Sequence, residues 1–334
     1  MSDKRRVIIG IIAAVLAIGL FGVCVHFIES RSMKEEQLGD SGGWGEGDEE
    51  TILSLGDNDY ITNDDIDTYL LIGTDNGGDD KGEGFNGELA DFITAIVIDN
   101  TTKSYAFYQI DRNTMVEVPI PEANGGGHYT EQICTAHWYG KSPEERNNNL
   151  VNAVSELLGG LEIKSYYTLN MNNIGKVNDA IGGVVVTIDS DMTAVDPDFK
   201  EGANILLTDG QAEKYLRARF ALEDDSNASR MKRQEAYMQS AYNMIIGQLR
   251  ENPEYISELY ENLDGLFETD GSARDASVIA DKFEKYKNMG MISFKGKVET
   301  NDTLGDGVEH EEFYVDTDSI VSGLKKVIKL QESE

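Results

Sequence analysis

The stretch FITAIVIDNTTKSYAFYQI, residues 92–110, carries the clearest structural signal in the chain. Two runs rich in β-branched and aromatic residues, 92–98 and 104–110, flank the polar segment DNTTK. Such runs favour β-strands, while a short link of Asp, Asn and Thr favours a turn. The stretch therefore predicts two antiparallel strands that form a hairpin.

Helix and strand signals alternate on both sides of this hairpin. The string SPEE at 142–145 offers a capping serine, a proline suited to the first turn and a capping-box glutamate, so a helix is predicted from there to Leu158. Other predicted elements are a strand at 69–73, a strand at 165–171, a helix at 172–181, a strand at 184–188, a helix from Thr208, and a long helix that Ser229 caps and that reaches Arg250. This alternation indicates an α/β domain of three layers with a central mixed sheet.

An uncharged apolar segment, VIIGIIAAVLAIGLFGVCVHFI, occupies residues 7–28. At about 1.5 Å of rise per residue, it is long enough to cross a hydrocarbon core of about 30 Å. Three basic residues precede it, so the positive-inside rule predicts a cytoplasmic tail at 1–6, a transmembrane helix at 7–28 and an exported remainder. A cleaved signal peptide is the alternative, but the following ESRSMKEEQ shows no small-x-small cleavage site.

Composition divides the exported part in two. Residues 29–60 are rich in Gly, Glu, Asp and Ser and contain few apolar residues, so they are predicted to form an acidic linker. From Tyr69 onward the composition is that of a globular protein. One extracytoplasmic domain is therefore predicted over residues 61–334.

The chain is strongly acidic, with 29 Lys and Arg against 61 Asp and Glu and a formal net charge of -32. Repulsion from phosphates excludes nucleic acid as a general partner. Cys24 falls in the apolar segment, so Cys134 is the lone exported cysteine and no intrachain disulfide is expected there. Cys134 and His137 could supply two metal ligands, but no second pair accompanies them, so a buried structural pair is the better interpretation.

Arginines gather in one part of this acidic chain. Four of the 11 arginines fall within 17 residues, two at the end of one predicted helix and two at the start of the next: Arg217, Arg219, Arg230 and Arg233. A helix N-terminus already favours anions, and guanidinium groups bind phosphate oxygens in pairs. The cluster is therefore a candidate phosphate site. The alternative is a set of surface ion pairs with the neighbouring acidic residues Asp224, Asp225 and Glu235.

Two aspartates stand at the ends of predicted strands. Asp75 follows the run LLIG and Asp91 directly precedes FITAIVI, so antiparallel pairing would bring both to one rim of the sheet. Two carboxylates that face several arginines suit a magnesium-bound phosphate. Each could instead be an ordinary turn or edge residue. Arg112, in the string QIDRNT just after a strand, is a further candidate, although a lone arginine there is usually structural.

Seven short motifs follow one another in a characteristic order. They are LLIGTD, GELADFITAIVI, DRNT, SELLGGLEIKSYYTLN, VNDAIGGVVVTI, LRARF and SRMKRQEAY, and they lie within residues 69–245. In order and approximate spacing this series resembles the LytR-CpsA-Psr family of cell-wall polymer transferases. Each motif is weak alone, but by the whole series the chain is identified as a member.

The resemblance implies a fold and a reaction. Family members carry a three-layer α/β/α-like domain with a central mixed sheet outside the cell membrane of Gram-positive bacteria, behind one transmembrane helix. They move an anionic glycopolymer, such as teichoic acid or capsule, from a polyprenyl-pyrophosphate carrier to peptidoglycan, with Mg²⁺ neutralising the pyrophosphate. The expected protein is thus a membrane-anchored, magnesium-dependent phosphotransferase.

The resemblance also implies a role for individual residues. Carried over by position, Asp75 and Asp91 would hold Mg²⁺. Three arginines would bind the pyrophosphate oxygens and act with Asp91 in catalysis: Arg112, Arg217 and Arg219. The substrate site would be completed by Arg230, Arg233 and Gln234. Asp111 or another nearby carboxylate could serve as the base.

The chain departs from the family pattern at several positions. The family's arginines shortly after Gly-x-Asp and just before the second aspartate are absent, Asn113 stands where the family has Asp, and EQICTAHWYG replaces a lysine-asparagine string. His137 and Trp138 could replace some of the lost contacts, although packing is the usual role of such a pair. These departures leave open a non-catalytic protein that binds or senses a polyprenyl-phosphate lipid, and also a pyrophosphate hydrolase.

Overall fold

The computed structural model covers most of the predicted domain. It describes residues 50–75, 88–119, 127–218, 222–252, 265–272, 285–303 and 307–333, with Gly305 and a few residues between 253 and 284. Within these residues, no helix is long and apolar enough to cross a membrane. The predicted transmembrane segment at 7–28 lies outside the described residues, so that prediction stands as made.

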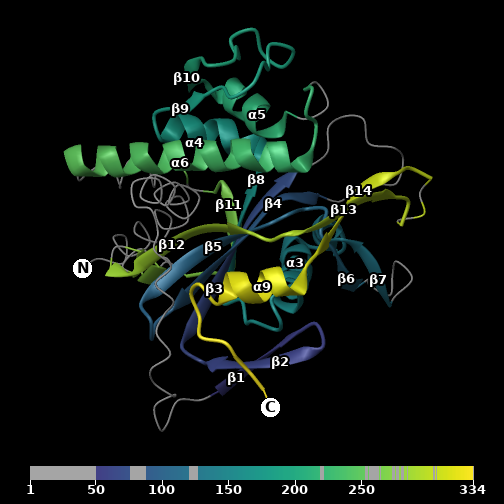
Figure 1. Cartoon of the computed structure of the whole chain (residues 1–334). Helices are drawn as coiled ribbons and strands as arrows, with labels where there is room; N and C mark the ends of the chain where they lie inside the picture. Colours follow the sequence, from purple (N-terminus) through teal and green to yellow (C-terminus); the bar gives the residue numbers. More distant parts are fainter. Residues whose placement is uncertain are drawn as a thin grey trace.

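A six-stranded mixed sheet forms the centre of the domain, in the order β11-β8-β3-β4-β5-β12 (Figure 1). The strands are β3 (Ile66–Asp75), β4 (Leu89–Asp99), β5 (Ser104–Ile110), β8 (Ser165–Asn170), β11 (Phe267–Thr269) and β12 (Lys287–Ser293). β3 and β4 pair antiparallel, as do β4 and β5, whereas β8 runs parallel to β3 and β12 parallel to β5. The predicted hairpin and the mixed sheet are confirmed.

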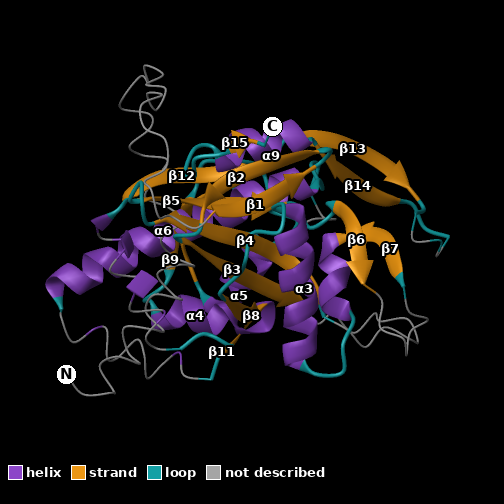
Figure 2. Cartoon of the chain, turned by 90° about the horizontal axis from the view of Figure 1, so that it is seen from below, coloured by secondary structure: helices purple, strands orange, loops and turns teal. Residues whose placement is uncertain are grey.

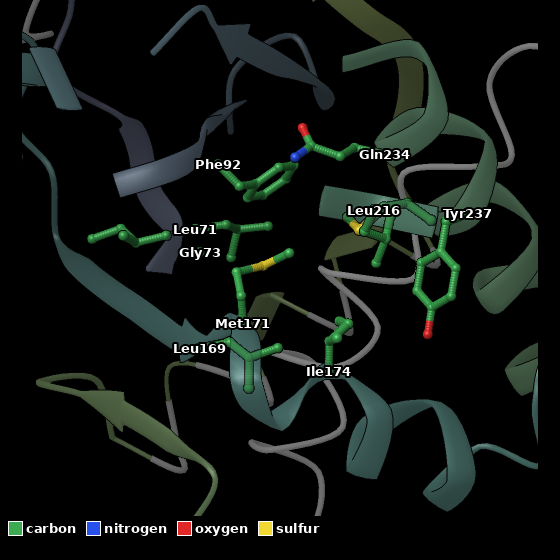
Figure 3. Close-up of a pocket in the computed structure, with 11 residues that line it drawn as sticks. Leu71, Gly73, Phe92, Leu169, Met171, Ile174, Leu216, Gln234 and Tyr237 are labelled. Carbon is green, nitrogen blue, oxygen red and sulfur yellow. The ribbon is translucent and has the colours of Figure 1, made fainter. Parts of the chain in front are cut away.

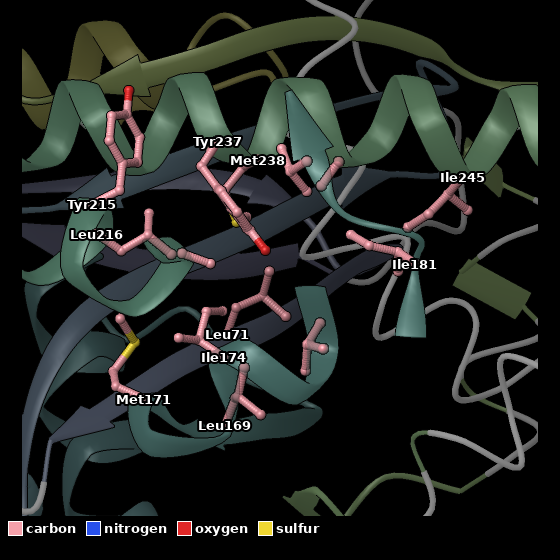
Figure 4. Packing of buried hydrophobic residues seen from close by; sticks show 14 of the residues in the cluster. Leu71, Leu169, Met171, Ile174, Ile181, Tyr215, Leu216, Tyr237, Met238 and Ile245 are labelled. Atoms are coloured by element: carbon pink, nitrogen blue, oxygen red, sulfur yellow. The ribbon is translucent and has the colours of Figure 1, made fainter. Parts of the chain in front are cut away.

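Both faces of this sheet are covered, which explains why its central strands β3, β4 and β5 are buried along most of their length and are mainly apolar. On one face lie α4 (Ile174–Ala180), α5 (Asp209–Arg217) and α6 (Asn227–Glu251), with a small sheet of β9 (Val184–Thr187) and β10 (Asn204–Leu207). Figure 4 shows Tyr237 and Met238 of α6 above Leu71 and Leu169 of the sheet, and all four belong to one buried cluster.

The opposite face packs against α3 (Pro143–Leu157), α9 (Thr317–Leu324) and a second small sheet (Figure 2). That sheet consists of β1 (Glu50–Leu55), β2 (Asn58–Asn63) and β15 (Gln331–Glu332). The remaining elements are β6 (Met115–Pro119), β7 (His128–Gln132), the 3₁₀ turns η3 (Ile133–Trp138) and η4 (Met171–Asn173), β13 (Gly296–Asn301) and β14 (His310–Val315).

Local capping signals position the helices, with one correction. The Ser142 hydroxyl accepts from the Glu145 amide at 3.1 Å, and Thr208 and Gln211 form a capping box at the start of α5, as predicted. The predicted cap of the long helix was wrong. Ser226 caps α6 and accepts from Ser229 N at 3.1 Å, while the Ser229 hydroxyl accepts from Arg233 instead.

The predicted linker at 29–60 differs from the structure at its end. Residues 50–55 and 58–63 form the β1–β2 hairpin, in which Leu53 and Leu55 are buried. β15 adds to this hairpin from the other end of the chain, with Gln331 opposite Ile61. The acidic composition hid a local hairpin, since β1 and β2 are joined by two residues. The added strand β15 lies more than 250 residues away, and contacts at such sequence separation are invisible to a local pattern.

Candidate active site

The ends of β3 and β4 form a rim that carries both predicted aspartates. Gly73 lies opposite Phe92 and Thr74 opposite Ala90, so Asp91 is the extra residue of a β-bulge. Asp75 lies opposite Leu89 at the same end of the pair. Bulges bend a strand and redirect a side chain, and they are common beside active sites. The structure therefore brings Asp75 and Asp91 to one rim, as the antiparallel pairing predicted.

Asp91 lies between two arginines that come from different elements. Arg112, just after β5, places Nε 3.0 Å from Asp91 Oδ1, and Arg230 of α6 places Nη1 3.2 Å from Asp91 Oδ2. The three side chains are 15%, 13% and 6% exposed. We call these three residues the Asp91 cluster. Its net charge of +1 and its partial exposure leave it able to receive an anion.

Arg112 is oriented by a residue that sequence reasoning assigned only to packing. Its Nη2 donates to Cys134 Sγ at 3.1 Å, and Cys134 is fully buried in η3. Burial opposes the charge on Arg112, yet the neighbouring Asp91 carboxylate helps to raise the pKa of the guanidinium, which stays charged. The cysteine thus directs a guanidinium whose charge is permanent.

Asp75 forms a second ion pair on the same rim. Arg217, the last residue of α5, donates from Nη2 to both Asp75 oxygens, at 2.8 and 2.6 Å. Its Nη1 donates to Glu213 Oε1 at 2.7 Å and to Asn172 Oδ1 at 3.3 Å. The second predicted phosphate-binding arginine is therefore fixed beside the predicted metal ligand.

The other predicted residues have different surroundings. Arg233 is buried and donates to the carbonyl oxygens of Tyr215 and Ala218 and to Ser229 Oγ, so it fastens the end of α5 to α6. Gln234 is buried and lines a pocket, described next. Arg219 lies outside the described residues.

An apolar pocket lies between the sheet and the α5–α6 layer, directly behind this rim (Figure 3). Its cavity volume is about 40 Å³, and the adjoining space that is continuous with solvent brings the total to about 440 Å³. Phe92 and Leu216 line it, and they are the chain neighbours of Asp91 and Arg217. A Cβ on Gly73 would stand 2.9 Å from Phe92 Cβ and 3.3 Å from Met171 Sδ, so a side chain there would crowd the pocket wall. Charged rim and apolar pocket thus adjoin.

Comparison with known proteins places this chain in a family. The LytR_cpsA_psr family profile matches residues 41–327, which include every described element except β15. The chain belongs to the LytR-CpsA-Psr family. The resemblance of the seven motifs is thereby confirmed.

Individual relatives are distant. A polyisoprenyl-teichoic acid--peptidoglycan teichoic acid transferase TagU of Bacillus cereus is 30% identical over 152 residues, which cover 46% of this chain and 44% of that protein. Biofilm regulatory protein A of Streptococcus mutans is 23% identical over 195 residues, which cover 56% of this chain and 46% of that protein. The chain spans about half the length of the curated relatives that it matches.

Solved structures share the LytR-CpsA-Psr fold. Protein gbs0355 of Streptococcus agalactiae superimposes with a TM-score of 0.60 at 18% identity, over 78% of this chain and 86% of that one. TagT bound to LIIa-WTA gives a TM-score of 0.56 at 18% identity, over 79% of this chain and 90% of that one. At these identities the likeness establishes the fold.

One departure from the LytR-CpsA-Psr pattern has a local explanation. Asn113, which stands in place of the family's Asp, donates to Glu311 Oε1 at 2.7 Å and accepts from Gln132 Nε2 at 3.3 Å. Gln132 comes from EQICTAHWYG, the segment that replaces the family's lysine-asparagine string. Two departures therefore meet, and uncharged amides form the contact between them.

His137 and Cys134 are buried, as predicted for a structural pair. The His137 ring nitrogens lie 2.9 Å from the Glu88 carbonyl oxygen and 3.1 Å from Asn147 Oδ1. Burial lowers the pKa of His137. His137 thus ties the start of β4 to α3, which favours the packing interpretation.

The rim is compatible with a magnesium ion that arrives with a phosphate. In the described part of the chain no group of three His, Cys, Asp or Glu side chains could hold a metal alone. Mg²⁺ commonly binds through one or two carboxylates together with substrate phosphates, and Asp75 and Asp91 provide two carboxylates on one rim. The donor set therefore fits the predicted cation, and the arginines now on these oxygens would move to the phosphate.

Proposed function

We propose that this protein is a membrane-anchored phosphotransferase that moves an anionic glycopolymer from a polyprenyl-pyrophosphate carrier to peptidoglycan. The observation that carries the proposal is the Asp91 cluster beside the Arg217–Asp75 pair, at the edge of an apolar pocket. Such a site matches a ligand that is a pyrophosphate at one end and a hydrocarbon at the other. The relatives named as teichoic acid transferases, and TagT bound to LIIa-WTA, support it.

The two arginine–aspartate groups would bind the pyrophosphate. Arg112 and Arg217 exchange a carboxylate oxygen for a phosphate oxygen while keeping their other partners, Cys134 and Glu213. Phosphoryl transfer depends chiefly on positioning and on neutralising the phosphate oxygens, and donors fixed in advance serve both. Asp75 and Asp91 would hold Mg²⁺, which supplies further positive charge when bound.

The transfer step follows from this binding mode. A sugar hydroxyl of peptidoglycan attacks the phosphorus next to the glycopolymer, and the bond from that phosphorus to the bridging oxygen breaks. Polyprenyl phosphate leaves with the bond's electron pair, and the hydroxyl proton passes to a carboxylate of the site. Burial raises the pKa of Asp111 and the Glu311 carboxylate adds to this, so Asp111 accepts a proton more readily than an ordinary aspartate.

The apolar pocket would receive the first part of the lipid. Burying hydrocarbon contributes about 25 cal/mol per Å². Leu71, Phe92 and Tyr237 are among the side chains around the pocket in Figure 3, and Gln234 lies at the same edge as Phe92. The predicted helix at 7–28 would hold this pocket near the membrane that contains the lipid.

A non-catalytic lipid-binding protein is the second candidate. The absent loop arginines and the uncharged contact between Asn113 and Gln132 favour it, because both reduce the positive charge available to a leaving phosphate. Retention of the Asp91 cluster and of Arg217 favours transfer.

The test uses the full-length protein in detergent micelles with a polyprenyl-pyrophosphate-linked glycopolymer and Mg²⁺. Release of polyprenyl monophosphate is followed with and without a peptidoglycan oligomer. The proposal expects release that requires the oligomer and that Arg112→Ala abolishes. Tight lipid binding without release would establish the second candidate, and release that ignores the oligomer would indicate pyrophosphate hydrolysis.

A further inference from the structure

Asn227 joins Arg230 of the Asp91 cluster to the half-buried carboxylate of Asp111, the candidate base. Its Oδ1 accepts from Arg230 Nη2 at 2.6 Å, and its Nδ2 donates to Asp111 Oδ1 at 2.6 Å. Asn227 is 1% exposed and is the first residue of α6. We propose that Asn227 is a positioning residue that holds Arg230 toward the pyrophosphate through Asp111. This inference rests on the proposed function.

The hydrogen-bond chain gives Arg230 a single orientation. One Nη donates to Asn227 and the other lies on Asp91, so the guanidinium is held between α6 and the bulge of β4. Asp111 is fixed in turn, because its Oδ1 also accepts from the Asn113 amide at 2.8 Å. Asn227 and Arg230 come from the first turn of α6, Asp111 follows β5 and Asp91 lies in β4, and the hydrogen-bond chain runs from Asp111 through Asn227 and Arg230 to Asp91. When a pyrophosphate oxygen replaces the Asp91 carboxylate as the partner of Arg230, Asn227 keeps the guanidinium in place.

An amide is the group that this position requires. Arg230 offers only donors and an ionised Asp111 offers only acceptors, so the residue between them must accept on one side and donate on the other. A carboxylate at position 227 would satisfy Arg230 but oppose Asp111. An aliphatic residue would satisfy neither and would leave buried polar atoms without partners, which is costly.

The sharpest test exchanges the two groups. Asn227→Asp alone puts two carboxylates face to face. Adding Asp111→Asn restores one carboxylate and one amide, with the amide nitrogen turned toward residue 227. Because Asp111 Oδ1 accepts from both Asn227 and the Asn113 backbone in the wild type, this orientation gives up the contact to Asn113. Total charge and side-chain size match the wild type, so the double variant differs in which residue holds the charge and in the contact to the Asn113 backbone.

Binding of farnesyl pyrophosphate with Mg²⁺ to the full-length protein is measured by calorimetry, alongside thermal unfolding. Loss of a charge-assisted hydrogen bond predicts about ten- to hundredfold weaker binding for Asn227→Asp. The exchanged variant is expected to recover to within about threefold of the wild type, a non-additive result that two independent losses could not give. Should Asn227→Asp fail to fold, the exchanged variant carries the test, because it must fold and bind.

Asn63→Asp is the matched control. Asn63 is 1% exposed and its Nδ2 lies 3.5 Å from Asp99 Oδ2, at the end of β4 opposite Asp91. Asn63→Asp should lower the stability of the protein and leave its binding of farnesyl pyrophosphate unchanged. Wild-type affinity in Asn227→Asp, or a folded exchanged variant that does not bind, would overturn the positioning role. Absence of binding by the wild type would instead overturn the proposed function.

Discussion

The antiparallel pair of β3 and β4 carries a carboxylate with two cations toward each of its ends, and the cations differ in kind. At the start of the strand, Asp67 pairs with Lys164 and Lys282 and accepts from Asn100 Nδ2 at 3.1 Å. Toward the far end, about 20–23 Å away at about 3.3 Å per residue, Asp91 lies opposite the Gly73–Thr74 step and pairs with Arg112 and Arg230. We call the first group the Asp67 cluster. Charge alone does not distinguish the two.

The geometry of the cations distinguishes them. Both lysines of the Asp67 cluster direct their single ammonium group at Asp67. Each arginine of the Asp91 cluster uses one nitrogen on Asp91 and a second on a fixed partner, Cys134 or Asn227. A guanidinium can thus exchange the carboxylate for a phosphate without losing its orientation, whereas an ammonium that leaves Asp67 has no such guide. On this comparison we propose that the Asp91 cluster serves to bind a ligand and that the Asp67 cluster serves stability.

The largest expected difference between the clusters is in turnover. Arg112→Ala should lower kcat/KM for glycopolymer release by at least about 10²-fold, because a fixed donor at the transferred phosphate is lost. Lys282→Ala should leave kcat/KM unchanged and lower the free energy of unfolding by about 1–3 kcal/mol, since a buried partner of Asp67 is removed. Steady-state kinetics and urea unfolding of both variants make the comparison. An activity loss in Lys282→Ala equal to that in Arg112→Ala would contradict the proposed difference between the two clusters.

A second difference concerns the apolar pocket, which adjoins the Asp91 cluster and not the Asp67 cluster. Ile174 lines this pocket, and Ile174→Phe should reduce the rate with a long polyprenyl carrier by about tenfold, or about 1.4 kcal/mol. The rate with a farnesyl carrier should change less, because a shorter chain needs less of the pocket.

Val154→Phe is the control for overpacking itself. Val154 is buried in the core on the opposite face of the sheet, and an extra ring there should cost about 1–3 kcal/mol of stability. Its rates with the two carriers should fall together or not at all. A chain-length effect equal to that of Ile174→Phe would show that the pocket does not receive the lipid.

The pH dependence of stability should have opposite signs at Asp67 and Asp111. Burial opposes the charge on Asp67, but hydrogen bonds from Lys164, Lys282 and Asn100 lower its pKa below 3.8. The stability from Asp67 is therefore present above pH 3.8 and is lost as the pH falls through its folded-state pKa. Burial raises the pKa of Asp111 above 3.8, so its stability is present below pH 3.8 and is lost as the pH rises through its folded-state pKa.

Urea unfolding between about pH 6 and pH 3 measures this contrast. The free energy of unfolding that Asp67→Asn loses relative to wild type should shrink toward acid pH. The loss caused by Asp111→Asn should grow toward acid pH. Parallel curves for the two variants would contradict the assignment of opposite pKa shifts.

The smallest expected effect is on stability and binding, and it comes from removing the cap of either of two helices. Ser142→Ala and Ser226→Ala each remove an N-cap hydroxyl that accepts a backbone N–H, and each should lower stability by about 1 kcal/mol. Ser226 precedes Arg230 by one helical turn, so Ser226→Ala should also weaken farnesyl pyrophosphate binding, whereas Ser142→Ala should not. Calorimetry on both variants decides this, and equal affinities would mean that the cap does not position Arg230.

Much of the fold was predictable because its signals are local. The apolar runs of the β4–β5 hairpin, the string at Ser142 and the box at Thr208 each lie within a few residues, and all three were confirmed. The cap of α6 was misplaced because Ser226 and Ser229 are equally good caps by sequence. The β1–β2 hairpin is a local signal that was missed because its acidic surroundings resemble a linker, whereas the addition of β15 from the other end of the chain has no local signal.

The site was predictable in part. The arginines and aspartates were conspicuous in the motifs, and strand pairing correctly brought the two aspartates to one rim. The partners that orient the arginines were not predictable. Cys134 and Asn227 meet Arg112 and Arg230 only through tertiary packing, and neither residue type signals phosphate chemistry. The backbone contacts that occupy Arg233 also depend on the α5–α6 packing.

The most direct test of the central claim is a crystal structure of the protein with farnesyl pyrophosphate and Mg²⁺. The account predicts the pyrophosphate on Arg112 and Arg217, Mg²⁺ between it and the two aspartates Asp75 and Asp91, and the farnesyl chain in the pocket lined by Phe92. Pyrophosphate bound elsewhere, with the Asp91 cluster unchanged and the pocket empty, would contradict it.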